Sequence, residues 1–207
     1  MINYSNQIFD ILDKTLKSHD KATFVVSGGS SPIKIFNELS SMPINWSKVT
    51  VTLVDDRFVD KSHKDSNEKL VFEKLMINNA KDINFISLCN SSEEVLNIKR
   101  PFDIMLLGMG EDGHFASLFP PMIQSKPNYF DPLCKPEIIH TEPMGDPKHK
   151  RVTMNLSMIL KSKKIILLVS NQKKLDLINK AKTNRNLPIH FLLNQKEVDV
   201  DIFELFS

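Results

Sequence analysis

An Asp-Gly-His segment is the part of this chain best suited to acid–base chemistry. Asp112, Gly113 and His114 close a glycine-rich run that begins at Gly108. An imidazole can take up a proton near neutral pH, and a neighbouring carboxylate can fix its tautomer and stabilise the charged ring. The glycine between the two side chains permits a turn that brings both to one pocket. The segment therefore favours a catalytic pair over a purely structural histidine.

A second glycine run, Ser27 to Pro32, has the character of an anion site. Gly28, Gly29 and Ser30 follow an apolar segment, and Pro32 suits the first position of a helix. Backbone N–H groups at the start of a helix, with hydroxyls nearby, favour a phosphate group. A tight strand-to-helix turn with a serine cap explains the same residues, so both interpretations stay open.

The glycine run that contains Asp112 and His114 also matches the G-x-G-x-x-G fingerprint of dinucleotide-binding folds, through Gly108, Gly110 and Gly113. That fingerprint opens a βαβ unit and is followed, ~20 positions later, by an acidic residue at the end of a second strand. Here the chain enters a proline-rich region instead. We therefore expect no dinucleotide cofactor.

Further charged residues follow other apolar runs. Asp55, Asp56 and Arg57 stand together at the end of one run, where buried acids are costly unless they are paired or functional. Adjacent strand residues point to opposite faces, so these three cannot all share one pocket. Arg151 and Lys174 can each supply a cation to a phosphate, although surface charge is the commoner role of such residues.

The composition argues against several classes of function. The net charge of +2 gives no general reason to expect binding to nucleic acid or to a membrane. Cys89 and Cys134 have no metal-ligand spacing and the chain has no H-E-x-x-H motif, so we expect no metal site and two unpaired thiols. No stretch approaches the ~20 apolar residues that span a bilayer. A cytoplasmic protein is expected.

Apolar runs alternate with amphipathic segments, which predicts an α/β fold with a parallel sheet covered on both faces. We predict buried strands at Thr23–Val26, Val49–Val54, Ile104–Leu107 and Ile165–Val169, and weaker ones at Phe85–Leu88 and Ile189–Leu193. We predict helices at Asn6–Ser18, Pro32–Ser40, Ser66–Asn78, Ser92–Ile98, Ser157–Lys161 and Gln172–Ala181. Asp65-Ser66-Asn67 is interpreted as a helix cap rather than a substrate contact.

One segment interrupts this alternation. Pro120 to Pro147 holds seven of the eleven prolines, which is too many for a regular element. We interpret it as a long loop that covers the mouth of the pocket, because long loops in compact domains are often functional. No domain boundary is evident, and we expect residues 1–207 to form one domain.

Together these motifs resemble the 6-phosphogluconolactonase family over nearly the whole chain. The most specific part is the segment LGMGEDGHFASLFP, from Leu107 to Pro120. Glucosamine-6-phosphate deaminases share its Gly-x-Asp-Gly-His core, but the ASLFP ending and Arg57 look like the lactonases. The resemblance implies a Rossmann-like three-layer α/β/α sandwich with a mostly parallel sheet, of the deaminase/lactonase type.

The resemblance also implies a reaction. His114 would be the general base for attack of water on a lactone carbonyl, Asp112 would orient it, and Asp55 would lie near the reacting carbon. The family hydrolyses 6-phospho-D-glucono-1,5-lactone in the oxidative pentose phosphate pathway without a cofactor. The implied partner is this small phosphosugar lactone, and the implied assembly is a monomer or homodimer. A glucosamine-6-phosphate deaminase and a non-catalytic phosphosugar-binding module are the alternatives.

The implied substrate-binding residues lie in the glycine run from Ser27 to Pro32 and at three basic positions: Gly28, Gly29, Ser30, Arg57, Arg151 and Lys174. Two departures from the family pattern stand beside them. Asp56 replaces the usual glutamate, and Asn171 replaces the usual glycine before the Lys174 helix. The second departure makes Lys173 a rival of Lys174.

Overall fold

A computed structural model describes residues 4–206 and is built around a six-stranded sheet. Its strands, in the order in which they lie side by side, are β4 (Asn84–Ile86), β2 (Val49–Leu53), β1 (Ala22–Val26), β5 (Ile104–Leu107), β8 (Ile165–Val169) and β9 (Val200–Glu204). All neighbouring strands are parallel. Every residue of β5 and β8 is buried, as expected for a sheet that is covered on both faces.

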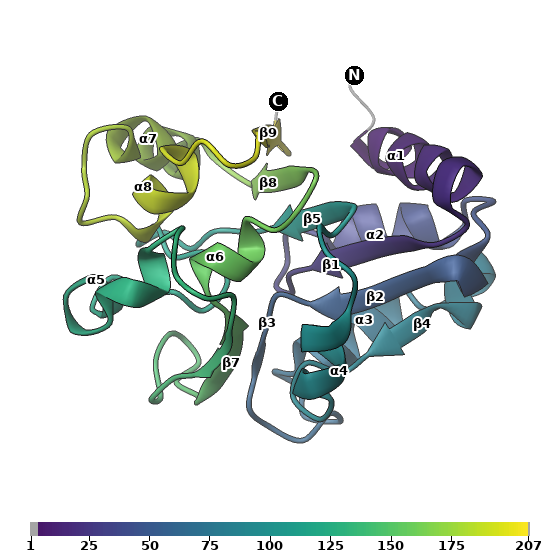
Figure 1. The fold of residues 1–207 in the computed structure, drawn as a ribbon, viewed down its shortest axis with the longest axis horizontal. Helices are drawn as coiled ribbons and strands as arrows, with labels where there is room; N and C mark the ends of the chain where they lie inside the picture. The colour runs from purple at the N-terminus through teal and green to yellow at the C-terminus, as the bar shows by residue number, and fades with distance from the viewer. Residues whose placement is uncertain (1–3, 207) are drawn as a thin grey trace.

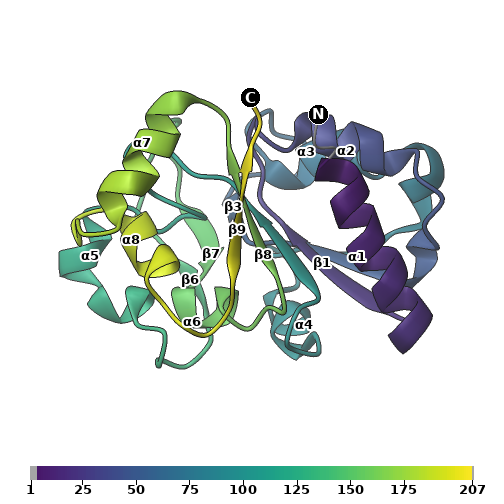
Figure 2. The same ribbon diagram turned by 90° about the horizontal axis from the view of Figure 1, so that it is seen from above.

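Helices cover both faces of this sheet. Figure 2 shows α1 (Tyr4–His19), α2 (Ile33–Ser40) and α3 (Asn67–Lys74) on one side, and α7 (Gln172–Ala181) and α8 (Pro188–Leu193) on the other. The remaining helical segments are α4 (Ser92–Asn97), α5 (Met122–Ser125), α6 (Leu156–Ile159) and the 3₁₀ turns Trp46–Lys48, Asn78–Asp82 and Pro127–Phe130. The predicted three-layer α/β/α sandwich is confirmed. No helix within residues 4–206 is long and apolar enough to cross a membrane.

A small antiparallel sheet stands beside the main one. It contains β3 (Asp55–Arg57), β7 (Arg151–Met154) and β6 (Ile138–His140), in that order, and Figure 1 shows β3 and β7 beside each other. Val54 joins the two sheets, because its N–H donates to Val26 O and its carbonyl accepts from the N–H of Met154. The chain thus passes straight from the end of β2 into the strand that carries Asp55 and Arg57.

The predicted strand at Ile189–Leu193 is wrong, because this segment is helix α8. Pro188 occupies its first turn, where the missing N–H costs nothing. The buried residues Ile189 and Leu192 are three positions apart, which is the spacing of one helix face rather than of a strand. A short apolar run does not distinguish a buried strand from a buried helix.

The proline-rich segment also differs from expectation. It contains α5, a 3₁₀ turn and β6, so it is not devoid of regular structure. Other differences are at element ends: β4 stops at Ile86 rather than Leu88, and α3 stops at Lys74 rather than Asn78. Residues 120–147 contribute none of the described residues that line the main cleft, so their predicted place over its mouth is not observed.

Candidate active site

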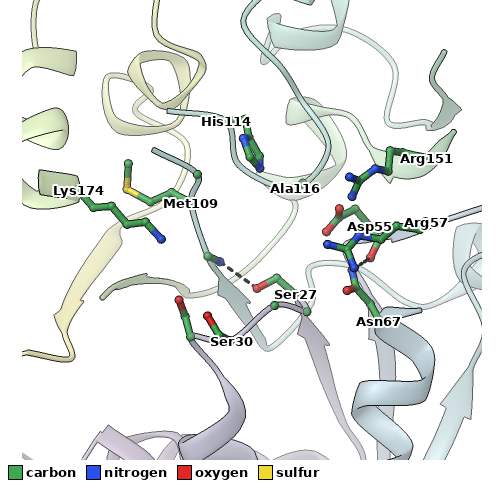
Figure 3. A pocket seen from close by; sticks show the side chains of 15 residues that line it. Ser27, Ser30, Asp55, Arg57, Asn67, Met109, His114, Ala116, Arg151 and Lys174 are labelled. Carbon is green, nitrogen blue, oxygen red and sulfur yellow. Dashed lines mark hydrogen bonds between the residues drawn. The ribbon is translucent and has the colours of Figure 1, made fainter. Parts of the chain in front are cut away.

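A cleft of about 200 Å³ lies where the carboxyl ends of β1 and β5 approach β3 and β7 (Figure 3). It is lined by every predicted site residue except Asp112: Gly28, Gly29, Ser30, Asp55, Arg57, His114, Arg151 and Lys174. Ligands of open α/β sheets bind outside the carboxyl ends of the strands. The loops after two separate strands therefore build one site.

The two glycine loops are joined directly to each other. The hydroxyl of Ser27 accepts a hydrogen bond of 2.9 Å from the N–H of Gly108. Gly29 has φ +82°, a left-handed conformation that favours glycine. Asn67 fills the space beside Gly28, where an added Cβ would lie 2.0 Å from the Asn67 Oδ1. Gly28 is thus required for a close approach and Gly29 for a turn.

His114 is held by Asp112 at one ring nitrogen. Asp112 Oδ1 lies 2.5 Å from Nδ1 of His114 and also accepts the backbone N–H of His114 at 3.1 Å. With a carboxylate acceptor at Nδ1, the proton of the neutral ring sits there and Nε2 is the basic nitrogen. Figure 3 shows the ring directed into the cleft. This geometry leaves Nε2 free to take up a proton from the cleft.

Two positions of the backbone around this pair favour glycine, one for space and one for its conformation. A Cβ at Gly110 would lie 2.2 Å from ring atoms of His114, and Gly113 has φ +81°. The Gly113 carbonyl accepts the N–H of Ile189 at 2.9 Å, so the first turn of α8 supports the loop. The ring of Phe119 packs against His114 with 4.6 Å between centroids.

His114 favours the ionised form of Asp112. Burial alone would raise the pKa of Asp112, but the hydrogen bond and the charge of His114 outweigh it and hold that pKa below its ordinary value. The carboxylate is therefore ionised at neutral pH. An ionised Asp112 stabilises the imidazolium that forms when His114 takes up a proton.

Asp55 enters the cleft from β3 and is held by residues that the sequence interpretation did not assign to the site. Ser117 donates a 2.6 Å hydrogen bond to Asp55 Oδ2, and Asn67 Nδ2 donates to the Asp55 carbonyl at 3.0 Å. Asn67 itself lines the cleft, whereas the cap of α3 is Ser66. The place of Asn67 in the cleft was not evident from the sequence, because the same short segment also forms the cap of α3.

Asp56 points to the opposite face of β3, as strand alternation predicts. It accepts backbone N–H groups of Arg57, Asn67 and Glu68 at 2.7, 2.7 and 3.1 Å. Burial raises the pKa of Asp56 to about 6, against the lowering effect of these three donors. Asp56 therefore fastens the start of α3 to the strand and does not line the cleft.

Arg57 and Arg151 are direct neighbours across the antiparallel β3–β7 pair. Like charges in this position destabilise a sheet. Both Nε atoms are buried without a hydrogen-bond partner among residues 4–206. Burial lowers the pKa of Arg151 and the charge of Arg57 lowers it further, yet arginine stays charged in proteins. Such a pair is suited to an anion that would compensate both charges.

Backbone carbonyls hold the two guanidinium groups in place. Arg57 donates to the Asp65 carbonyl at 2.5 Å. Arg151 donates to the carbonyls of Pro147 and Met144 at 2.9 and 3.4 Å and lies over the ring of Phe119, 5.7 Å from its centroid. Both arginines are thus positioned before any ligand arrives.

Lys174, and not Lys173, lines the cleft. Asn171 caps α7 by accepting the N–H of Lys174 at 3.0 Å, so asparagine replaces the family's glycine without loss of the helix start. Lys173 is exposed. Burial lowers the pKa of Lys174, while the charge of Glu111 opposes that shift.

Comparisons with known proteins agree with this geometry. Residues 2–201 match the family model described as "Glucosamine-6-phosphate isomerases/6-phosphogluconolactonase". The 6-phosphogluconolactonase of Neisseria meningitidis is 33% identical over 96% of this chain and 91% of that protein. The Helicobacter pylori 6-phosphogluconolactonase is also 33% identical, over 94% of this chain and 88% of its own.

A solved structure gives the same result for the fold. The crystal structure of a 6-phosphogluconolactonase from Shewanella baltica superposes with a TM-score of 0.87 and 34% identity, covering 97% of this chain and 90% of that one. Residues 2–201, which match the family model, include both glycine loops and the strands that carry Arg57 and Arg151. The chain therefore belongs to the glucosamine-6-phosphate isomerase/6-phosphogluconolactonase family.

Proposed function

We propose that this protein hydrolyses 6-phospho-D-glucono-1,5-lactone to 6-phosphogluconate in the oxidative pentose phosphate pathway. The observation that carries the proposal is one cleft that is lined both by His114, which Asp112 orients, and by the neighbouring arginines Arg57 and Arg151. The lactonase names of the relatives support it. A phosphorylated ester needs these two features: a base for water and a cationic anchor for phosphate.

Binding of the substrate is assigned to three basic side chains and to the glycine loop from Ser27 to Pro32. Arg57 and Arg151 hold the phosphate, because guanidinium groups match its oxygens in charge and geometry. Lys174 reaches into the cleft from the facing side (Figure 3) and adds a third positive charge. Anchoring the phosphate fixes the lactone ring, so binding energy remote from the carbonyl is used for orientation.

The chemical step is assigned to His114. Its Nε2 takes a proton from water as the water oxygen attacks the lactone carbonyl, and Asp112 stabilises the imidazolium. The bond between the carbonyl carbon and the ring oxygen then breaks, and the proton passes from His114 to that oxygen. The products are a carboxylic acid, which ionises, and a free hydroxyl group.

Two further groups complete the proposed site. Asp55, fixed by Ser117, is an acceptor for a substrate hydroxyl close to the reacting carbon. The negative oxygen that forms on the carbonyl needs a donor, and the amides of the glycine loops or Arg57 can supply it. No metal or cofactor is required by this route.

The test is hydrolysis of freshly prepared 6-phosphogluconolactone, measured above the spontaneous rate. The wild-type protein should accelerate ring opening, and His114→Ala should lose about 10²- to 10⁴-fold in kcat, the usual contribution of a general base. His140→Ala is the matched control, because His140 is exposed on β6 outside the cleft. His114→Ala should still bind 6-phosphogluconate.

Other outcomes point to other functions. Release of ammonia from glucosamine 6-phosphate would identify the deaminase alternative. Binding of 6-phosphogluconate without any turnover would identify a phosphosugar-binding module. Full activity in His114→Ala would remove the assigned base while leaving the binding assignment intact.

A further inference from the structure

His63, Asp65 and His149 gather beside the arginine pair, outside the residues that line the cleft. His63 and Asp65 lie in the segment between β3 and α3, and His149 lies just before β7. Asp65 Oδ2 is 2.9 Å from Nε2 of His149 and 3.7 Å from Nδ1 of His63. One ligand atom from each side chain lies within 4.8 Å of the others. All three side chains are partly buried.

This set of donors is one that borderline divalent metal ions prefer. Two imidazoles and one carboxylate are a known ligand set of zinc sites that keep a fourth position for water. Around a tetrahedral ion with bonds of ~2.0–2.1 Å, ligand atoms stand about 3.3 Å apart. The two observed distances to Asp65 Oδ2 lie on either side of that value. Closing the site requires the ring of His63 to move toward the Asp65 carboxylate and the ring of His149 to move slightly away from it.

We propose that His63, Asp65 and His149 bind a divalent transition-metal ion of the zinc class. The ligand atoms are Nδ1 of His63, Oδ2 of Asp65 and Nε2 of His149. Nδ1 of His63 now accepts the backbone N–H of Asp65 at 3.1 Å, and the ion takes that lone pair in its place. The neighbouring Lys64 and Lys148 are exposed, so solvent screens their repulsion of the ion.

The place of the ion in the fold suggests what it does. Asp65 supplies the carbonyl that holds Arg57, and the segment that ends at His149 supplies the carbonyls of Met144 and Pro147 that hold Arg151. An ion on these ligands ties the two supporting segments together. It is a structural ion beside the anion site and takes no part in the attack of water.

Cobalt(II) is the probe that tests this site directly. It takes the place of zinc and gives visible absorption that is strong only when the ion is four-coordinate. The metal-free full-length protein, titrated with CoCl₂, should bind one Co²⁺ per chain with this spectrum, and ZnCl₂ should displace it. His149→Ala and Asp65→Asn should each weaken Co²⁺ binding by at least about tenfold. Zn²⁺ should raise the melting temperature of the wild type but not of these variants.

Two matched variants locate the ion. His114→Ala removes the other histidine that has a carboxylate partner, and His140→Ala removes an exposed histidine of β6; both should keep the Co²⁺ spectrum. Melting curves without metal show whether each variant is folded. Loss of the spectrum in His114→Ala, or its persistence in folded His149→Ala, would place the ion elsewhere and overturn the proposal. Absence of Co²⁺ binding to the wild type would overturn it as well, without any bearing on lactone hydrolysis.

Discussion

The proposed base, His114, and the arginine pair, Arg57 and Arg151, share one cleft but are built in opposite ways. The side chains of His114 and Asp112 are 31% and 48% exposed and stand on a glycine loop. Arg151 is only 4% exposed and belongs to a β-strand whose register places it against Arg57. Phe119 contacts both regions, because its ring packs against the imidazole of His114 and lies under the guanidinium of Arg151.

This difference follows from what each region has to do. A general base exchanges protons with water, so it must remain accessible to solvent. Charges that hold an anion act more strongly when water is excluded, because the effective dielectric constant is lower. The guanidinium groups of the buried Arg151 and the partly buried Arg57 repel each other unless an anion compensates their charges. The repulsion between the two arginines therefore lowers the stability of the ligand-free protein and favours the binding of an anion. The region of His114 depends instead on the conformation of a backbone turn.

Gly110→Ala should have the largest effect in this comparison, and it should affect the base region alone. The new methyl group would push on the His114 ring, and a catalytic group misplaced by ~1 Å can cost about a hundredfold in rate. We expect kcat for the lactone to fall by that factor. The affinity for 6-phosphogluconate, measured by calorimetry, should be unchanged. A loss of affinity with normal kcat would show that the two regions are not separable.

Arg57→Gln should affect the other region. A charge-assisted hydrogen bond contributes roughly 1.5–3 kcal/mol, so KM should rise by about ten- to a hundredfold, with a smaller change in kcat. The melting temperature of the ligand-free variant should not fall, because a like-charge pair is removed. Arg57→Lys keeps the positive charge but lacks the planar guanidinium group, so its KM should lie between those of the wild type and Arg57→Gln. A variant with normal KM would remove Arg57 from the phosphate site.

Lys174→Met and Lys173→Met form a matched pair of neighbours on α7. Lys174→Met should raise KM by about tenfold, as expected for the loss of one cationic donor at a half-buried position. Lys173→Met should be neutral, because Lys173 is exposed. Steady-state kinetics of the two variants distinguish them. Equal effects would mean that general charge attraction, and not a specific contact, explains the role of α7.

The smallest effect on function is expected from substitution of Asp56, whose side chain lies on the face of β3 opposite to Arg57. Its pKa is about 6 in the folded chain against an ordinary 3.8, so the folded state holds a proton more tightly than the unfolded state. Its contribution to the free energy of unfolding is greatest below pH 4 and is lost as the pH rises to 6, by up to about 1.4 kcal/mol per pH unit. Denaturant titrations of wild type and Asp56→Asn at several pH values measure the difference. A difference of opposite slope would show that the three amide donors outweigh burial.

Much of the fold and the site could be predicted from local sequence. Buried parallel strands such as β5 and β8 are continuous apolar runs, and the glycine loops after β1 and β5 identify the edge of the sheet where ligands bind. The Asp112–His114 pairing needs only one turn between neighbours. Whether Ile189–Leu193 forms a strand or a helix could not be predicted from the sequence, because a five-residue segment with four apolar residues fits either element.

The sequence by itself therefore determined the layered α/β fold, the two glycine loops and the pairing of Asp112 with His114. Only the tertiary structure decided which charges share the cleft. The register of β3 against β7 sets Arg57 opposite Arg151, and Asp65 meets His149 across 84 positions of the chain. The hydrophobic patterns of helices and strands repeat every few residues, so short segments of sequence predict them. The pairing of distant strands depends instead on how the whole chain packs.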